Sequence, residues 1–246
     1  IGLSEAIPFL GAALFAGHLA DIFNRKKIIL ITVSIYLLCA FFLFSFTFNL
    51  QNVLVLYGTL PIYAVIALSG FARAALYPAQ MALMAQIVPR ENYTNSSTWN
   101  STAWHIAAVS GPALGGLMYG FFGVSAAYLL VMIMVLGSML LFAWIKSKPI
   151  PPKEKIETLF QSLGAGIRFV FKNQIILGAL SLDMFAVLFG GAVAMLPVFA
   201  AEVLNTGPIG LGFLRAAPAT GAVFMSLLLA YYPPVKKAGL KLLWSV

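Results

Sequence analysis

Seven long apolar runs, separated by short polar segments, divide the chain. They lie near residues 2–20, 28–48, 53–77, 100–121, 124–145, 174–200 and 209–232. A helix needs about 20 predominantly apolar residues to cross the hydrocarbon of a bilayer, and each run has roughly that length. The pattern therefore predicts an all-α membrane protein with about seven membrane-spanning helices.

The amino-acid composition agrees with this class. Hydrophobic residues make up 61% of the chain and charged residues only 9%, whereas a soluble domain has about 25% charged residues. The net charge of +8 would suit a surface that binds nucleic acid. The basic residues lie in short loops between apolar runs, however, so we expect no nucleic-acid partner. A single cysteine, Cys39, cannot form an internal disulfide or a cysteine metal cluster, and we expect no metal site.

The distribution of basic residues predicts the orientation of the spans. All Lys and Arg residues except Arg73 and Arg215 lie in alternate connections, and the connections near 49–52, 121–124 and 201–208 contain none. Cytoplasmic loops carry the excess of Lys and Arg in membrane proteins. We therefore expect the basic connections to face the cytoplasm.

The longest connection, near 146–173, separates two groups of spans. Its Pro-rich stretch from Lys148 to Lys153 predicts an extended linker. Apolar residues at helical spacing from Leu159 to Phe171 predict a short amphipathic helix on the inner membrane surface. The expected parts are an N-terminal helical half without its first span at 1–147, a linker at 148–173 and the start of a truncated C-terminal half at 174–246. If each half has six spans, one precedes the chain and four follow it.

The polar turn at 17–27 lies between the first two apolar runs. It contains Gly17, Asp21, Arg25 and Lys26. A carboxylate near a helix C-terminus is unfavourably placed, so Asp21 needs a partner, such as Arg25 or another helix's N-terminus. A charge pair that breaks and re-forms would make this loop a conformational latch. The alternative is a loop that sets only topology and turn geometry.

A glycine–proline element lies in the fourth apolar run. It consists of Gly111, Pro112, Gly115 and Gly116. Proline removes a backbone hydrogen bond and kinks a helix, and glycines on one face let another helix approach closely. We therefore expect a kinked helix in close contact with a neighbour.

Four formally charged residues lie within the apolar runs: Glu5, Arg73, Asp183 and Arg215. Charged groups are costly in lipid, so each is a candidate for substrate binding or proton coupling. Asp183 is the strongest candidate, because it lies well inside the sixth run with no base nearby in sequence. The alternatives are an Asp183 paired for packing with Arg215 or Arg73, and an Arg73 that reaches the cytoplasmic interface.

Common motifs of enzymatic and nucleotide-binding sites are absent from the sequence. It contains no His-Glu-x-x-His, no Gly-x-x-x-x-Gly-Lys-Ser/Thr and no Gly-x-Ser-x-Gly. We expect no catalytic residues and no cofactor. If the chain is a transporter, the absence of a nucleotide-binding motif favours an ion gradient over bound ATP as its energy source. The alternative class is a seven-span receptor or sensor, which the division into five spans, a linker and two spans disfavours.

The turn at 17–27 resembles the loop signature of the major facilitator superfamily, Gly-x-Leu-Ala-Asp-Arg-x-Gly-Arg-Lys, with Ile22 and Asn24 as departures. The glycine–proline element resembles a fifth-span element of that family's antiporters. The Arg of the family's fourth span is replaced here by Ile66. The later spans resemble those of bacterial efflux permeases related to siderophore and macrolide exporters.

This resemblance implies a fragment that covers the second to eighth of the family's expected twelve spans. It implies a secondary transporter in which two halves alternately open a central site to each side of the membrane. The expected function is antiport, in which protons are exchanged for an exported amphipathic drug or siderophore-like molecule. The expected partners are that small molecule, protons and the lipid bilayer, and we expect a monomer in the bacterial inner membrane.

Overall fold

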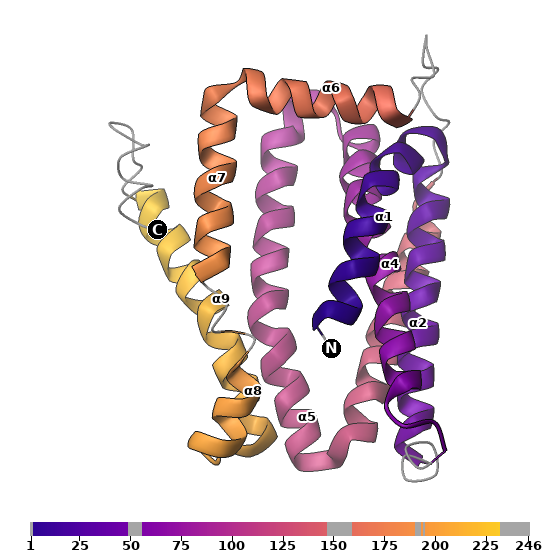
Figure 1. Cartoon of the computed structure of the whole chain (residues 1–246), viewed down its shortest axis with the longest axis vertical. Helices are drawn as coiled ribbons and strands as arrows, with labels where there is room; N and C mark the ends of the chain where they lie inside the picture. Colours follow the sequence, from indigo (N-terminus) through magenta and orange to yellow (C-terminus); the bar gives the residue numbers. More distant parts are fainter. Residues whose placement is uncertain (1, 49–55, 147–158, 190–192, 194, 232–246) are drawn as a thin grey trace. The chain divides into compact units, whose positions relative to one another are not determined.

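The computed structural model describes residues 2–48, 56–146, 159–189, 193 and 195–231, and most of them are helical (Figure 1). In chain order the elements are α1 (Gly2–Ile22), α2 (Arg25–Phe48), α4 (Leu60–Ile87), the 3₁₀-helix η1 (Arg90–Asn92), α5 (Tyr93–Trp144), α6 (Leu159–Lys172), α7 (Gln174–Phe189), α8 (Leu196–Val198), the π-helix η3 (Phe199–Val203) and α9 (Gly207–Tyr231). The described residues form no strand. The all-α fold class is confirmed.

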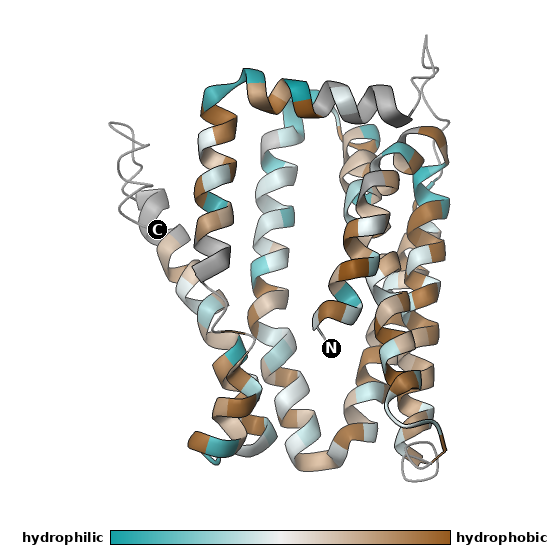
Figure 2. Cartoon of the chain, in the orientation of Figure 1, coloured by the Kyte–Doolittle hydropathy of each residue, from teal (hydrophilic) through white to brown (hydrophobic). Residues whose placement is uncertain are grey.

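Three described helices are long and apolar enough to cross a membrane, namely α2, α4 and residues 95–144 of α5. Figure 2 shows hydrophobic residues along much of α2. Helix α5 has 52 residues, more than twice the about 20 that one crossing needs. It is interrupted at Gly123, whose φ of 84° and ψ of 173° are not helical and are accessible to glycine. Two successive segments result, as the apolar runs at 100–121 and 124–145 predict.

One predicted span ends in the wrong place. The prediction places the third span at 53–77, whereas α4 continues to Ile87. Hydropathy falls in the last part of α4, where polar residues such as Gln80 occur. A helix ends where its backbone hydrogen bonds end, however, and the N–H of Val88 still donates to the carbonyl of Met84. Apolar length therefore underestimates the extent of this helix.

Within the segment predicted as one span at 174–200, the described helical elements are α7, α8 and the start of η3. Helix α7 ends at Phe189, and α8 begins at Leu196. The expected amphipathic helix after the linker is present as α6. The extended stretch predicted from Lys148 to Lys153 lies outside the described residues.

The chain forms two compact units. The first contains Ile1–Thr98 and Phe122–Leu163, and the second contains Trp99–Phe121 and Gly164–Val246. The chain passes between the units twice within α5, after Thr98 and next to the break at Gly123, and once within α6, after Leu163. The division of the chain at its linker into two halves stays a prediction.

The core of the first unit lies between α2, α4 and the second segment of α5. Ile29, Val33, Ala79 and Leu83 are buried against one another. The partly buried residues packed around them are Ile28, Leu76, Val135, Met139 and Phe142. Lipid tails are as apolar as these side chains, so tight van der Waals packing stabilises such a core more than the hydrophobic effect does.

In the second unit, the first segment of α5 crosses α9 at a pair of glycines. A Cβ atom added to Gly116 would lie 2.8 Å from the Cα of Gly212, and one added to Gly212 would lie 2.7 Å from the carbonyl oxygen of Pro112. These distances leave no room for a side chain. Gly111 and Gly115 have open space instead. The contact expected of the glycine–proline element is therefore made through Gly116 and the carbonyl of Pro112.

Candidate transport site

Helix α1 crosses α4 at a glycine of α4. A Cβ atom added to Gly70 would lie 2.6 Å from the carbonyl oxygen of Glu5, so only glycine lets the two backbones come this close. Both helices also carry buried small residues, namely Ala72 and Ala74 close to Gly70 in α4 and Ala16 further along α1. This close crossing places Glu5 beside α4.

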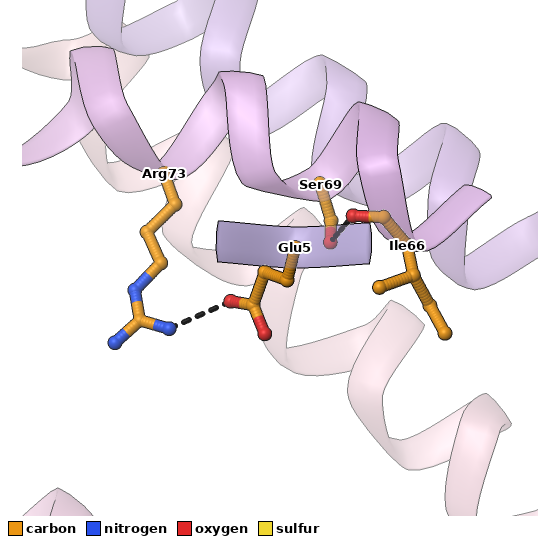
Figure 3. Close-up of polar contacts among 4 residues, drawn as sticks. All are labelled: Glu5, Ile66, Ser69 and Arg73. Atoms are coloured by element: carbon orange, nitrogen blue, oxygen red, sulfur yellow. Dashed lines mark hydrogen bonds and ion pairs between the residues drawn. The ribbon is translucent and has the colours of Figure 1, made fainter. Parts of the chain in front are cut away.

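Glu5 and Arg73 form a salt bridge across the crossing (Figure 3). The Nη1 of Arg73 donates to the Oε1 of Glu5 at a distance of 2.6 Å. The side chain of Arg73 is 63% exposed and that of Glu5 is 35% exposed, so both charges remain accessible. Among the residues that the structure describes, this is the only salt bridge.

An aromatic ring lies near the cation of the pair. The guanidinium carbon of Arg73 lies 5.8 Å from the centroid of the Phe9 ring, within the range of a cation–π contact. The site thus combines an anion, a cation and aromatic surface, which can hold a proton and contact an amphipathic molecule.

The position of the family's intramembrane Arg is occupied by Ile66. Its carbonyl accepts a hydrogen bond from the Oγ of Ser69 at 2.7 Å (Figure 3). This turn of α4 therefore presents no charge. The cation of the site comes from Arg73, about two turns further along the same helix.

The other two candidate residues lie in the second unit. Asp183 belongs to α7 and Arg215 to α9, and both are exposed. No salt bridge joins them within the described part of the chain. The structure thus pairs Arg73 with Glu5, and gives no support to a packing pair between Asp183 and Arg215.

The basic residues at the start of α2 contact the carbonyl groups of other helices. Arg25 donates through Nε to the carbonyl of Ala20 and through Nη1 to that of Ala82, both at 3.3 Å. The Nζ of Lys26 donates to the carbonyl of Ala143 at 2.8 Å. These acceptors lie toward the C-terminal ends of α1, α4 and α5, where cations are favoured. The start of α2 therefore joins three helix ends of the first unit.

The other residues of the polar turn at 17–27 include Asp21, Gly17 and Asn24. The side chain of Asp21 lies outside the described residues, so its pairing with Arg25 stays a prediction. Around Gly17 the structure leaves open space for a Cβ atom. The Oδ1 of Asn24 accepts a hydrogen bond from the backbone N–H of Lys27 at 3.3 Å, as an N-cap residue does. The Asn that departs from the family signature thus begins α2.

The long apolar helices α2, α4 and α5 indicate an integral membrane protein. The sequence profile of the Major Facilitator Superfamily matches residues 2–245. The chain therefore belongs to this superfamily, whose members are transporters and not enzymes. The receptor alternative receives no support from this match.

The chain is similar in sequence to two bacterial transporters. The chain is 25% identical over 217 residues to the uncharacterized MFS-type transporter YkuC of Bacillus subtilis (strain 168), an alignment that covers 80% of this chain and 46% of that protein. It is 27% identical over 250 residues to the enterobactin exporter EntS of Shigella flexneri, with 100% of this chain and 57% of that protein covered. The chain thus spans about half the length of these relatives.

Proposed function

We propose that this chain is part of a secondary active exporter that moves an amphipathic small molecule, such as a drug or a siderophore-like compound, out of a bacterial cell in exchange for protons. The observation that carries the proposal is the Glu5–Arg73 salt bridge between two helices of a transporter-family chain. The similarity of the chain to the enterobactin exporter supports export as the direction of transport. We propose a monomer in the inner membrane as the working form.

Glu5 is the proposed proton carrier. While ionised, its carboxylate accepts the N–H of Arg73 at 2.6 Å, and charge-assisted hydrogen bonds of this kind are strong. A proton on Glu5 cancels the negative charge and removes this attraction, so α1 and α4 lose one of the contacts that join them. Proton binding is thereby linked to the packing of two helices, as alternating access requires.

The substrate is proposed to compete with the proton at the same carboxylate. An amphipathic molecule with N–H or O–H donors would bind ionised Glu5 and place its apolar part against Phe9, which lies near Arg73. A proton that enters would then release the substrate. Competition for one group couples the two movements in opposite directions.

Asp183 is the competing proton carrier. It lies on α7, in an exposed position, and Arg215 on α9 is the proposed cation of the same substrate route. Glu5 is preferred because it has a partner whose attraction a proton would remove, whereas no salt bridge of Asp183 occurs among the described residues.

Two further motifs have proposed roles in the conformational cycle. The loop that contains Gly17, Asp21, Arg25 and Lys26 would stabilise one of the two states through the carbonyl contacts of Arg25 and Lys26. The glycine–proline element would act as in the family's antiporters, by keeping the first segment of α5 against α9. The contact between Gly116 and α9 supports this role.

The proposal is tested in everted membrane vesicles that contain the full-length gene product. Respiration acidifies the vesicle interior, and acridine orange fluorescence reports the pH gradient. Addition of enterobactin or ethidium should partly restore the fluorescence, because substrate entering the vesicle exchanges for protons that leave. Glu5→Gln should abolish this restoration, and the purified variant should bind the probe more weakly and without dependence on pH, because its neutral amide resembles the protonated carboxyl.

Other carboxyl variants decide between the carriers. Asp183→Asn should retain exchange, and so should Glu202→Gln, which changes an exposed carboxylate in η3. If Asp183→Asn loses exchange and Glu5→Gln keeps it, the carrier is Asp183 and the assignment of Glu5 is wrong. If neither probe collapses the gradient with the unmodified protein although both bind, proton exchange itself is wrong.

A further inference from the structure

Helix α6 ends at a corner held by hydrogen bonds. Residues Leu159–Lys172 lead through Asn173 into α7, and Figure 1 shows α6 lying across the end of α7. The backbone N–H of Asn173 donates to the carbonyls of Phe169 and Val170, both at 3.2 Å. Its Oδ1 accepts from the N–H of Ile176 at 3.5 Å. The change of direction between the two helices is therefore fixed at one residue.

Apolar and basic side chains are exposed together at this corner. Ile167 is 60% exposed, Phe171 is 69% exposed, and Ile175 at the start of α7 is 85% exposed. Ile167 and Phe171 are four residues apart and so lie on one face of α6. Arg168 and Lys172 have the same spacing on the neighbouring face and are also exposed. An apolar stripe thus runs beside two cations.

A bilayer surface is the partner that this arrangement fits. Helix α7 is an apolar helix of a membrane protein, so the corner keeps α6 close to lipid. Helices with an apolar face beside Lys and Arg lie in the membrane interface with that face in the lipid. Segment 146–173 contains six basic and two acidic residues, and such an excess is attracted to anionic headgroups.

We propose that α6 lies in the plane of the membrane interface. Ile167, Phe171 and Ile175 insert among the acyl chains, and Arg168 and Lys172 bind anionic lipid headgroups. This contact anchors the corner from which α7 begins, and it makes the position of α7 depend on the anionic lipid content of the bilayer. The inference holds whatever the substrate and the coupling ion are.

Phe169 provides a matched control on the same helix. It has the same side chain as Phe171 and a similar exposed fraction, 62%. Two residues along an α-helix turn the side-chain direction by about 200°, so Phe169 points away from the stripe of Ile167 and Phe171. Insertion into lipid therefore distinguishes the two phenylalanines, whereas general exposure does not.

The experiment measures the surroundings of a label at each position. The full-length gene product, in a cysteine-free background that includes Cys39→Ala, carries bimane at Phe171→Cys, Ile175→Cys or Phe169→Cys. The vesicles contain phosphatidylcholine and phosphatidylglycerol. Brominated acyl chains should quench the labels of Phe171→Cys and Ile175→Cys several-fold more than that of Phe169→Cys, and iodide in water should show the reverse order.

Two results would overturn insertion. Equal quenching of all three labels by brominated lipid would mean that the stripe has no preferred side. Labels at Phe171→Cys and Ile175→Cys that neither quencher reaches would mean that protein, rather than lipid, covers the stripe. Two inserted positions keep the test decisive when one of the variants does not fold.

A change of charge tests the headgroup contact. Arg168→Gln with Lys172→Gln should lower the lipid quenching of the Phe171→Cys label, in vesicles with phosphatidylglycerol, to the level found in phosphatidylcholine alone. Lys146→Gln removes an exposed cation outside α6 and should leave the quenching unchanged. If phosphatidylglycerol has no effect on quenching of the label without these charge changes, or if Lys146→Gln acts as strongly as the double variant, the assignment of Arg168 and Lys172 is wrong.

Discussion

The Nη1 of Arg73 lies 2.6 Å from the Oε1 of Glu5, and this contact joins two helices through residues 68 positions apart in the sequence. It depends on Gly70, because any Cβ atom there would meet the carbonyl oxygen of Glu5 at 2.6 Å. Because residue 70 is glycine, α1 packs directly against α4, and this brings the carboxylate of Glu5 within hydrogen-bond distance of the guanidinium of Arg73. Backbone packing and charge pairing therefore form one arrangement.

Gly70→Ala should break this arrangement. The added methyl group meets backbone rather than a movable side chain, so α1 must shift away from α4. Overpacking of this kind destabilises a protein by about 1–3 kcal/mol, and transport should fall with it. Thermal unfolding in detergent and substrate-dependent proton exchange measure the two effects.

Gly11→Ala is the control for that substitution, because nothing lies within 4 Å of its added Cβ. In a helix interior this change should be neutral or stabilise by up to about 1 kcal/mol. Equal losses of stability for Gly70→Ala and Gly11→Ala would contradict the close crossing.

Exchange of the two charges should preserve the stability of the protein. Glu5→Arg alone and Arg73→Glu alone each place like charges side by side, which is costly in a low-dielectric environment, and each should lose proton exchange. The double variant Glu5→Arg with Arg73→Glu restores opposite charges across the same crossing, and its stability should recover. Thermal unfolding of the three variants gives the coupling between the two sites; a double variant as unstable as the sum of the single ones would show that the pair does not join α1 to α4.

The glycine–proline element should respond differently at two adjacent positions. Gly116→Ala places a Cβ atom 2.8 Å from the Cα of Gly212 and 2.9 Å from the carbonyl oxygen of Pro208, so it should destabilise the protein by about 1–3 kcal/mol. Gly115→Ala meets nothing within 4 Å and should be tolerated. Melting temperature and transport of the two variants check this contrast. If Gly115→Ala lowers stability more than Gly116→Ala does, the helix contact is not made through Gly116.

Lys26→Met should weaken the packing of the first unit at the start of α2. It removes the hydrogen bond from Nζ to the carbonyl of Ala143, and a cation near a helix C-terminus stabilises by about 0.3–1 kcal/mol. Lys27→Met changes an adjacent exposed lysine and should have a smaller effect. Denaturation in mild detergent compares the two, and the expectation fails if the order is reversed.

The sequence by itself determined the class of this protein and most of its helices. A bilayer has a fixed thickness and offers no water to backbone groups, so an apolar run of about 20 residues indicates a helix that satisfies its own backbone. These constraints act locally and leave a local pattern, from which α2 and the two segments of α5 follow. The end of α4 at Ile87 does not follow, because a helix that extends past the lipid keeps its hydrogen bonds after its apolar pattern has ended.

Only the tertiary structure decided which residues meet. From the sequence, Arg73 is a charge that is costly to place in lipid, and Asp183 is one possible partner. In the structure, α1 crosses α4 and Arg73 forms its salt bridge with Glu5. The sequence likewise groups Gly115 with Gly116, although only Gly116 contacts α9. Helical periodicity tells which residues of one helix share a face. The neighbour that this face meets depends on how whole helices pack, and no short stretch of sequence contains that information.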